Sequence, residues 1–110
     1  MEITLHLEEA VERMGDRALY LEIAGYFVEL LPGTLAALTA SMEAENWQEM
    51  RRLAHSLKSN CAALGAEGVR EEAYKLELAC NEGRGEEARR LFAALAPLLE
   101  ALKEKLQTLS

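Results

Sequence analysis

Apolar side chains recur at intervals of three and four residues along nearly the whole chain. Because successive residues of a helix rotate by about 100°, this spacing gathers the apolar side chains on one face, which is typical of amphipathic α-helices. No stretch alternates apolar and polar residues for long enough to indicate a β-strand. The pattern therefore predicts an all-α fold.

Capping residues, glycine and proline divide this pattern into helices. A short first helix is expected over residues 7–14, and Gly15 ends it. Asp16 is a good N-cap for a second helix. Pro32-Gly33 interrupts that helix, and we expect a kink or a new first turn there, because proline removes one helical hydrogen bond. One side of this helix carries Leu19, Ile23, Tyr26, Phe27 and Leu30.

A third helix is expected over residues 47–64. Asn46 suits its N-cap, and Glu49 three residues later completes a capping-box-like pair. Gly65 suits a left-handed C-terminal cap, so the helix should stop there.

A fourth helix is expected over residues 67–82 and a fifth over residues 86–109, the latter with a kink at Pro97. Each connection is short, so successive long helices should lie antiparallel, as in an up-and-down bundle. At 110 residues the chain suits a single domain, residues 1–110, with one hydrophobic core.

Charge and hydropathy narrow the classes of function. The formal net charge is -7, which argues against nucleic acid as a partner, because nucleic-acid binders need positive surface to displace counterions. No apolar run approaches the ~18 residues of a membrane span, and residues 91–99 form the longest dense stretch. The N-terminus lacks the basic start and the apolar core of a signal peptide. We therefore expect a cytoplasmic protein that makes no membrane contact.

The two cysteines, Cys61 and Cys80, fall inside helical patterns without metal-ligand spacing. Helical rise should separate them by on the order of 15 Å along the bundle, which is too far for a disulfide. Free thiols are expected, as is usual in cytosolic proteins.

The candidate chemistry lies on the third helix. Its apolar face forms a core stripe, and the opposite face is polar with His55 near its middle. That polar face gathers Gln48, Arg51, Arg52, His55, Lys58, Ser59 and Ala62.

The neighbours of His55 suit phosphoryl chemistry. Arg51, Arg52 and Lys58 lie within one turn of it, so they should disfavour its protonation and leave a ring nitrogen free to attack an electrophile. The same cations would attract a phosphoryl group and offset charge on its oxygens. Ser59 is small and would let a partner approach closely. An exposed histidine among cations is nevertheless common on solvated helix faces. This geometry alone therefore leaves open that His55 is an ordinary surface residue without a chemical role.

The segment over residues 54–66, AHSLKSNCAALGA, adds a more specific signal. It resembles the signature of histidine-containing phosphotransfer (HPt) domains, in which a histidine is followed by a leucine two residues later and a lysine three residues later. Small residues follow, and a glycine stands ten residues after the histidine. The resemblance extends to Phe27 and Pro32, Asn46-Trp47, Leu76-Glu77 and Gly83.

The resemblance implies a fold, a function and partners. The fold would be an up-and-down antiparallel four-helix bundle with a short extra N-terminal helix. His55 would accept a phosphoryl group from a receiver-domain aspartate and pass it to another receiver in a multistep His-Asp phosphorelay. Lys58 would position or stabilise that group. The partners would be response-regulator receiver domains and a hybrid sensor histidine kinase.

The resemblance also bears on the docking surface and on cofactors. A receiver would dock over the exposed face of the third helix, where Gln48, Arg51, Arg52 and Ala62 are candidate contacts, and over part of the preceding helix. The family most often has glycine where this chain has Ser59, whose hydroxyl we expect to bond the imidazole or the phosphate. No cofactor is expected in this chain, since the magnesium would belong to the receiver.

Two other functions stay open. A helical module could dock receivers without carrying phosphate, or the bundle could be purely structural. The sequence has no glycine-rich phosphate loop, so we expect no ATP-dependent self-phosphorylation and no enzyme activity beyond the transfer step. The chain could be a free-standing carrier or one domain of a hybrid kinase, and a monomer is the default for an exposed, charged bundle.

Overall fold

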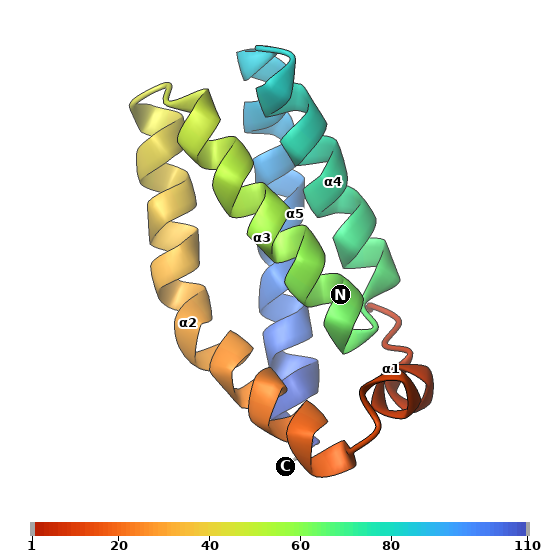
Figure 1. Cartoon of the computed structure of the whole chain (residues 1–110). Helices are drawn as coiled ribbons and strands as arrows, with labels where there is room; N and C mark the ends of the chain where they lie inside the picture. Colours follow the sequence, from red (N-terminus) through yellow and green to blue (C-terminus); the bar gives the residue numbers. More distant parts are fainter. Residues whose placement is uncertain (1, 110) are drawn as a thin grey trace.

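The computed structural model describes residues 2–109, and within them the regular structure is entirely helical (Figure 1). The helices are α1 (Leu7–Met14), α2 (Arg17–Glu43), α3 (Trp47–Leu64), α4 (Glu67–Asn81) and α5 (Gly85–Gln107). The predicted all-α fold is confirmed. The fourth helix ends one residue earlier than expected, and the fifth begins one residue earlier and ends two residues earlier, shifts that are usual at frayed helix ends.

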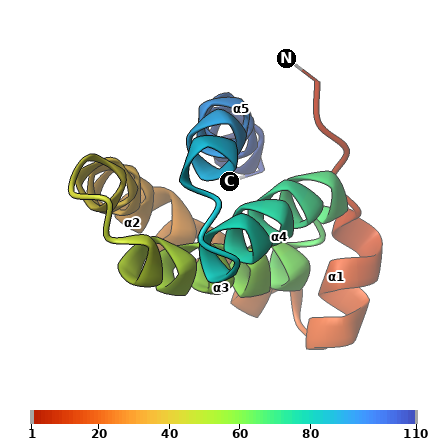
Figure 2. The same cartoon turned by 90° about the horizontal axis from the view of Figure 1, so that it is seen from above.

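Four helices form the bundle, and α1 lies outside it. Each long helix packs against its neighbours in chain order, and α5 closes the ring by packing against α2. Viewed from above, α2, α3, α4 and α5 surround a common centre (Figure 2). The short α1 contacts α2 and α3. The expected up-and-down bundle with a short extra N-terminal helix is therefore confirmed.

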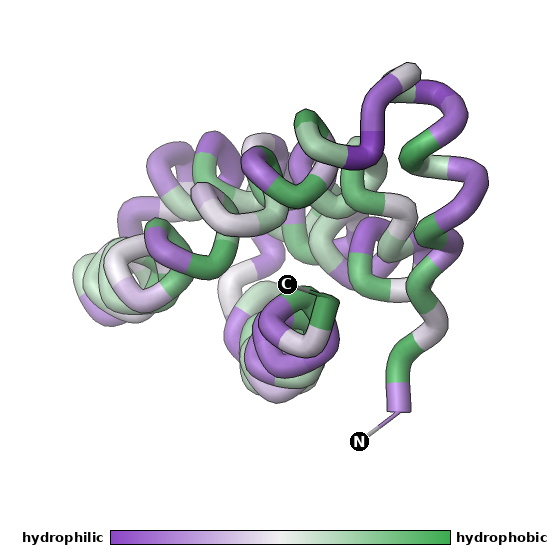
Figure 3. Tube along the Cα trace, turned by 90° about the horizontal axis from the view of Figure 1, so that it is seen from below, coloured by the Kyte–Doolittle hydropathy of each residue, from purple (hydrophilic) through white to green (hydrophobic). Residues whose placement is uncertain are grey.

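One contiguous core fills the bundle, and it is built mainly from leucine and alanine. Hydrophilic and hydrophobic residues are interspersed along the helices (Figure 3), and every helix contributes buried residues to this core. Burying a leucine-sized side chain is worth roughly 1.5–3 kcal/mol, and the stripe contributed by α3 is completely enclosed. That stripe consists of Met50, Ala54, Leu57, Cys61 and Leu64.

Capping residues begin α2 and α3 as the sequence indicates. The Asp16 carboxylate accepts a hydrogen bond from the Ala18 backbone N–H at 2.9 Å. The Asn46 side chain accepts one from the Glu49 backbone N–H at 3.2 Å. The Glu49 carboxylate does not complete the capping box by reaching back, because both of its oxygens bond Arg52 at 2.7 Å.

Both prolines lie inside continuous helices. The new first turn considered for Pro32 does not form, since α2 runs unbroken from Arg17 to Glu43. Figure 1 shows α2 changing direction between its orange and yellow halves, which fits the kink expected where proline removes a helical hydrogen bond. The last helix, α5, also continues through Pro97.

By length and composition alone, α2 could cross a membrane, since an 18-residue window reaches a mean hydropathy of 1.4. The sequence analysis missed this because the apolar residues of α2 are interrupted. Glu22 and Glu29 interrupt them and are exposed. Phe27, Leu31 and Leu38 of the same helix are buried in the bundle. These features fit a core helix that keeps one apolar side exposed.

Several bonds hold the end of α3 in place. Gly65 has φ +82° and ends the helix in the left-handed conformation, as expected. Its carbonyl accepts a hydrogen bond from the His6 backbone N–H at 2.9 Å. The Tyr20 hydroxyl donates to the Leu64 carbonyl at 2.6 Å, and Arg13 donates to the Ala62 carbonyl at 3.0 Å. The N-terminal segment and α2 therefore fix the reversal between α3 and α4.

Both cysteines are free and buried, as expected. Burial raises the pKa of Cys61 to about 12. Burial also raises the pKa of Cys80 to about 11, against a small opposite effect from Arg51. Both thiols therefore stay protonated near neutral pH, which makes them inert packing residues.

Candidate functional site

His55 lies near the middle of α3 with 56% of its side chain exposed. The helix presents it outward because Ala54 and Leu57, on either side of it in sequence, are buried in the core. The imidazole thus stands on a rigid element and is open to a partner molecule.

A carboxylate from the neighbouring helix contacts the ring. Glu77 of α4 places Oε2 3.0 Å from His55 Nδ1. Its other oxygen, Oε1, lies 2.8 Å from the Lys58 ammonium nitrogen Nζ. Oε1 is buried and lacks a well-aligned hydrogen bond, so this second contact is an ion pair. Glu77 is only 15% exposed, and it connects the two residues that the sequence had singled out for chemistry.

The charge state of Glu77 determines which nitrogen of His55 carries the proton. Burial favours a higher pKa for this carboxyl, but the pairing with Lys58 and the hydrogen bond from His55 outweigh it and lower the pKa. Glu77 is therefore ionised at neutral pH and can only accept hydrogen bonds. In the neutral imidazole, Nδ1 must then carry the proton, which leaves the lone pair on Nε2.

Lys58 is held from two directions. Besides its ion pair with Glu77, its ammonium lies 4.9 Å from the centre of the Tyr74 ring, also on α4. Only 23% of the lysine side chain is exposed. These two contacts therefore hold the Lys58 ammonium beside His55, where it does not move freely through solvent.

The expected ring of cations around His55 is corrected in one respect, because the group that touches the imidazole is acidic. Arg52 is turned back to Glu49 of its own helix. Arg51 is half-buried and close enough to Cys80 to affect its pKa. Helix periodicity could not reveal Glu77, because the wheel of α3 contains no residue of α4.

A cleft of about 360 Å³ opens beside His55 toward the C-terminal end of α3. Lys58, Ser59 and Ala62 line it from α3, and Arg70 and Tyr74 line it from α4. Ser59 is exposed there, and in the described part of the chain no hydrogen bond joins its hydroxyl to the His55 ring.

Comparison with known proteins decides the family. The family model described as Hpt domain matches residues 22–108. The chain belongs to the Hpt domain family. The Hpt domain has a histidine phosphotransfer role in phosphorelay signalling, and domains of this family interact with response-regulator receiver domains.

Solved structures agree with this Hpt fold. Histidine-containing phosphotransfer protein B from Pseudomonas aeruginosa PAO1 superposes with a TM-score of 0.81 at 22% identity, covering 93% of this chain and 87% of that chain. A rice protein provisionally described as a histidine-containing phosphotransfer protein gives a TM-score of 0.73 at 18% identity, covering 93% of this chain and 72% of that chain. No curated protein sequence matches the chain.

The predicted contact residues of this Hpt domain fall on both sides of His55. Gln48, Arg51 and Arg52 lie toward the N-terminal end of α3, where they line a shallow depression together with Asn46 and Glu49. Ala62 lies in the cleft toward the C-terminal end.

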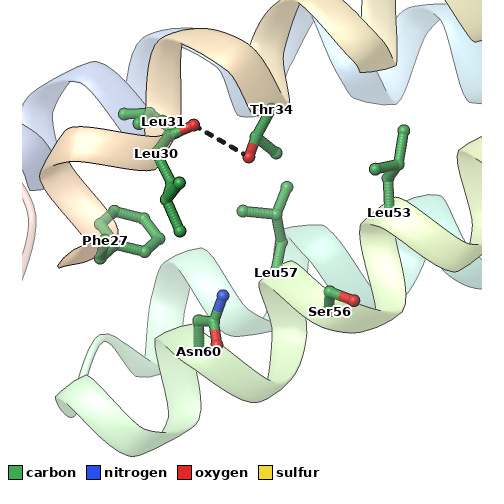
Figure 4. Close-up of a pocket in the computed structure, with 8 residues that line it drawn as sticks. All are labelled: Phe27, Leu30, Leu31, Thr34, Leu53, Ser56, Leu57 and Asn60. Atoms are coloured by element: carbon green, nitrogen blue, oxygen red, sulfur yellow. Dashed lines mark hydrogen bonds between the residues drawn. The ribbon is translucent and has the colours of Figure 1, made fainter. Parts of the chain in front are cut away.

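An apolar pocket that the sequence analysis did not single out lies between α2 and α3. Its volume is about 90 Å³. Leu30 and Leu57 point toward each other across it, with Phe27 beside Leu30 and with Ser56 and Asn60 along its α3 side (Figure 4). The other lining residues are Leu31, Thr34 and Leu53.

Proposed function

We propose that this Hpt domain is a phosphocarrier in a multistep His-Asp phosphorelay, with His55 as the residue that carries the phosphoryl group. His55 would accept the group from a receiver-domain aspartate and pass it to another receiver. The observation that supports this is the contact between His55 Nδ1 and the Glu77 carboxylate. It leaves the exposed ring with its lone pair on Nε2, as a nucleophile requires.

The transfer balances as a single in-line displacement. A bond forms between Nε2 and phosphorus while the bond between phosphorus and the aspartyl oxygen of the receiver breaks, and the aspartate leaves as a carboxylate. Positive charge develops on the imidazole, and the Glu77 carboxylate stabilises it through the Nδ1–H bond. The reverse displacement passes the group to the next receiver. The magnesium ion that this chemistry uses would belong to the receiver.

Lys58 and Ser59 would act on the phosphoryl oxygens. The Lys58 ammonium stands beside the ring and would offset the negative charge that grows during transfer. The Ser59 hydroxyl, exposed in the adjoining cleft, would donate a hydrogen bond to a phosphoryl oxygen. The variants Ser59→Gly and Ser59→Ala test this role, since both lack the hydroxyl and transfer rates equal to that of the parent would remove it.

The receiver would dock over α3 and the adjoining side of α2. Gln48, Arg51 and Arg52 would form the polar contacts, and the small Ala62 would let the receiver approach closely. The apolar contacts would come from the exposed side of α2, where Tyr26 is 57% and Leu30 is 65% exposed. Large apolar side chains exposed together are typical of protein interaction sites.

The decisive experiment measures intact mass and acid lability after incubation with a phosphorylated receiver. The expected result is one acid-labile phosphoryl group on the parent protein and none on His55→Gln. His6→Gln is the matched control, because His6 is the other of the chain's two histidines, and it should accept the group as the parent does.

The alternative is a docking module that binds receivers without accepting phosphate, and the exposed apolar side of α2 is equally compatible with it. The same experiment separates the two functions. A parent protein that binds receivers, yet stays unmodified by several phosphorylated receivers and by phosphoramidate, would overturn the carrier and favour the docking module.

A further inference from the structure

Tyr74 is an aromatic residue that the core does not need. It lies on α4 with 43% of its surface exposed, while Ala73 and Leu76 of the same helix are fully buried. Its ring faces the Lys58 ammonium at 4.9 Å, within the range of a favourable cation–π contact. Among residues 2–109, the other such contact joins Arg89 and Trp47, away from His55, at 5.4 Å.

Lys58 depends on two partners that respond differently to transfer. Glu77 binds both His55 and Lys58, one through each oxygen. As the imidazole becomes positive, the Glu77 carboxylate must stabilise two cations at once, and the incoming phosphoryl oxygens also attract the lysine. The Tyr74 ring carries no net charge and binds nothing else in this cluster. Its attraction for the ammonium therefore persists while the Glu77 ion pair loosens.

The position of the Tyr74 ring also suits it to hold the Lys58 ammonium near His55. Tyr74 and Lys58 together line the cleft that opens beside His55. An ammonium that leaves Glu77 but stays against the ring remains at the edge of this cleft, next to Ser59, and does not swing into solvent. A free lysine side chain populates many rotamers, so this restraint has a measurable effect.

We propose that Tyr74 is a positioning residue for Lys58, whose ring keeps the ammonium beside His55 during phosphoryl transfer. The proposal rests on the phosphocarrier function, and it assigns Tyr74 no contact with the phosphoryl group. It differs from a structural role because it acts only through Lys58.

The test uses phosphoramidate, a small donor that needs no docked receiver. The Nε2–phosphorus bond forms as the phosphorus–nitrogen bond of the donor breaks and ammonia leaves. Tyr74→Leu should slow phosphorylation about fivefold, the rate equivalent of a cation–π contact worth roughly 1 kcal/mol. Tyr74→Phe keeps the ring and should retain the parental rate. Leu78→Ala removes another exposed apolar side chain of α4 and is the control for general effects on that helix.

A second set of variants tests whether Tyr74 acts through Lys58. In a Lys58→Ala background, Tyr74→Leu should cause no further loss of rate. The proton resonances next to the Lys58 ammonium should be shifted by the ring in the parent and in Tyr74→Phe, and should lose that shift in Tyr74→Leu.

Three results would overturn the proposal. They are a parental rate for Tyr74→Leu, a loss for Tyr74→Phe equal to that for Tyr74→Leu, and an undiminished effect of Tyr74→Leu without Lys58. Failure of the phosphocarrier function is a distinct outcome, because the parent itself would then take up no phosphoryl group.

Discussion

Glu77 connects His55, the proposed nucleophile, and the Lys58 cation through its two oxygens. One oxygen holds the imidazole by Nδ1 and the other holds the Lys58 ammonium, so a single side chain fixes the orientation of both. This arrangement resembles the way in which a buried carboxylate orients a catalytic histidine in hydrolases. The rate of phosphorylation should therefore depend on a residue that never touches phosphorus.

Replacing Glu77 should separate its charge from its hydrogen bond. Glu77→Ala removes both, and phosphorylation of His55 by phosphoramidate should slow roughly tenfold to a hundredfold, the range that corresponds to a hydrogen bond between charged groups. Glu77→Gln keeps an acceptor for Nδ1–H and should lose less. Rates measured by intact mass over time check this order, and a parental rate for Glu77→Ala would contradict the assigned role.

The lowered pKa of Glu77 gives a pH dependence of stability with a definite sign. Because the folded-state pKa lies below the unfolded value, the ionised carboxylate stabilises the fold above the unfolded pKa, and this contribution is lost as the pH falls through the folded pKa. Glu77→Gln should therefore be less stable than the parent at pH 7, and the difference should shrink below about pH 4. Urea unfolding of both proteins across that range measures it, and a gap that widens in acid would contradict it.

Among elements, the hairpin of α3 and α4 determines which residues meet. His55 and Glu77 lie equally far in sequence from Ala66, and so do Lys58 and Tyr74. Two antiparallel helices joined by a tight turn bring such symmetric positions side by side. Applying this symmetry about Ala66, the residue after the predicted stop at Gly65, would have indicated Glu77 and Tyr74 from the sequence.

The sequence predicted helices better than contacts between them. Asp16, Asn46 and Gly65 placed helix ends correctly because capping depends on nearby residues. The effect of Pro32 was harder to predict. Its local preference allows a helix break, but the packing of residues on both sides of it allows α2 to continue. The predicted ring of cations around His55 was incomplete for a related reason. Periodicity describes one helix at a time, and Glu77 comes from the neighbouring helix α4.

Gly65 has a strict requirement for glycine that can be measured. An added Cβ would lie 2.6 Å from the His6 carbonyl oxygen, and the backbone has φ +82°. Gly65→Ala should lower the free energy of unfolding by about 2–4 kcal/mol from the left-handed strain and the clash combined. Gly68→Ala in α4 is the matched control, because nothing lies near its added Cβ, and it should be neutral or stabilising by up to ~1 kcal/mol. Denaturant unfolding that ranks the two variants equally would contradict this difference.

At the scale of the whole molecule, the bundle places the proposed chemistry and the proposed docking surface on different sides of His55. Glu77, Lys58 and Tyr74 lie on the α4 side of His55, and the apolar pocket with the exposed part of α2 lies on the other side. A partner that covers α3 and α2 would thus reach the imidazole without displacing the groups that hold it.

This separation predicts a variant in which phosphoryl transfer is slowed from one kind of donor and unchanged from the other. Leu30→Ser removes the most exposed large apolar side chain of α2 and should slow transfer from a phosphorylated receiver about tenfold, as expected for an interface residue worth more than ~1 kcal/mol. Phosphorylation by phosphoramidate should be unchanged, because that donor needs no docking surface. Equal losses with both donors would mean that Leu30 acts on the fold of the site.

The four residues that contact one another at the site all come from the stretch between Trp47 and Asn81, although the bundle needs helices from most of the chain. They are His55, Lys58, Tyr74 and Glu77. Contacts that are close in sequence cost little loop-closure entropy, so they form early during folding. The α3–α4 pair also has the most extensive helix contact in the bundle. The site should therefore already be native-like in the folding transition state, so that mutations within this pair slow folding and mutations in the packing of α2 against α5 mainly speed unfolding.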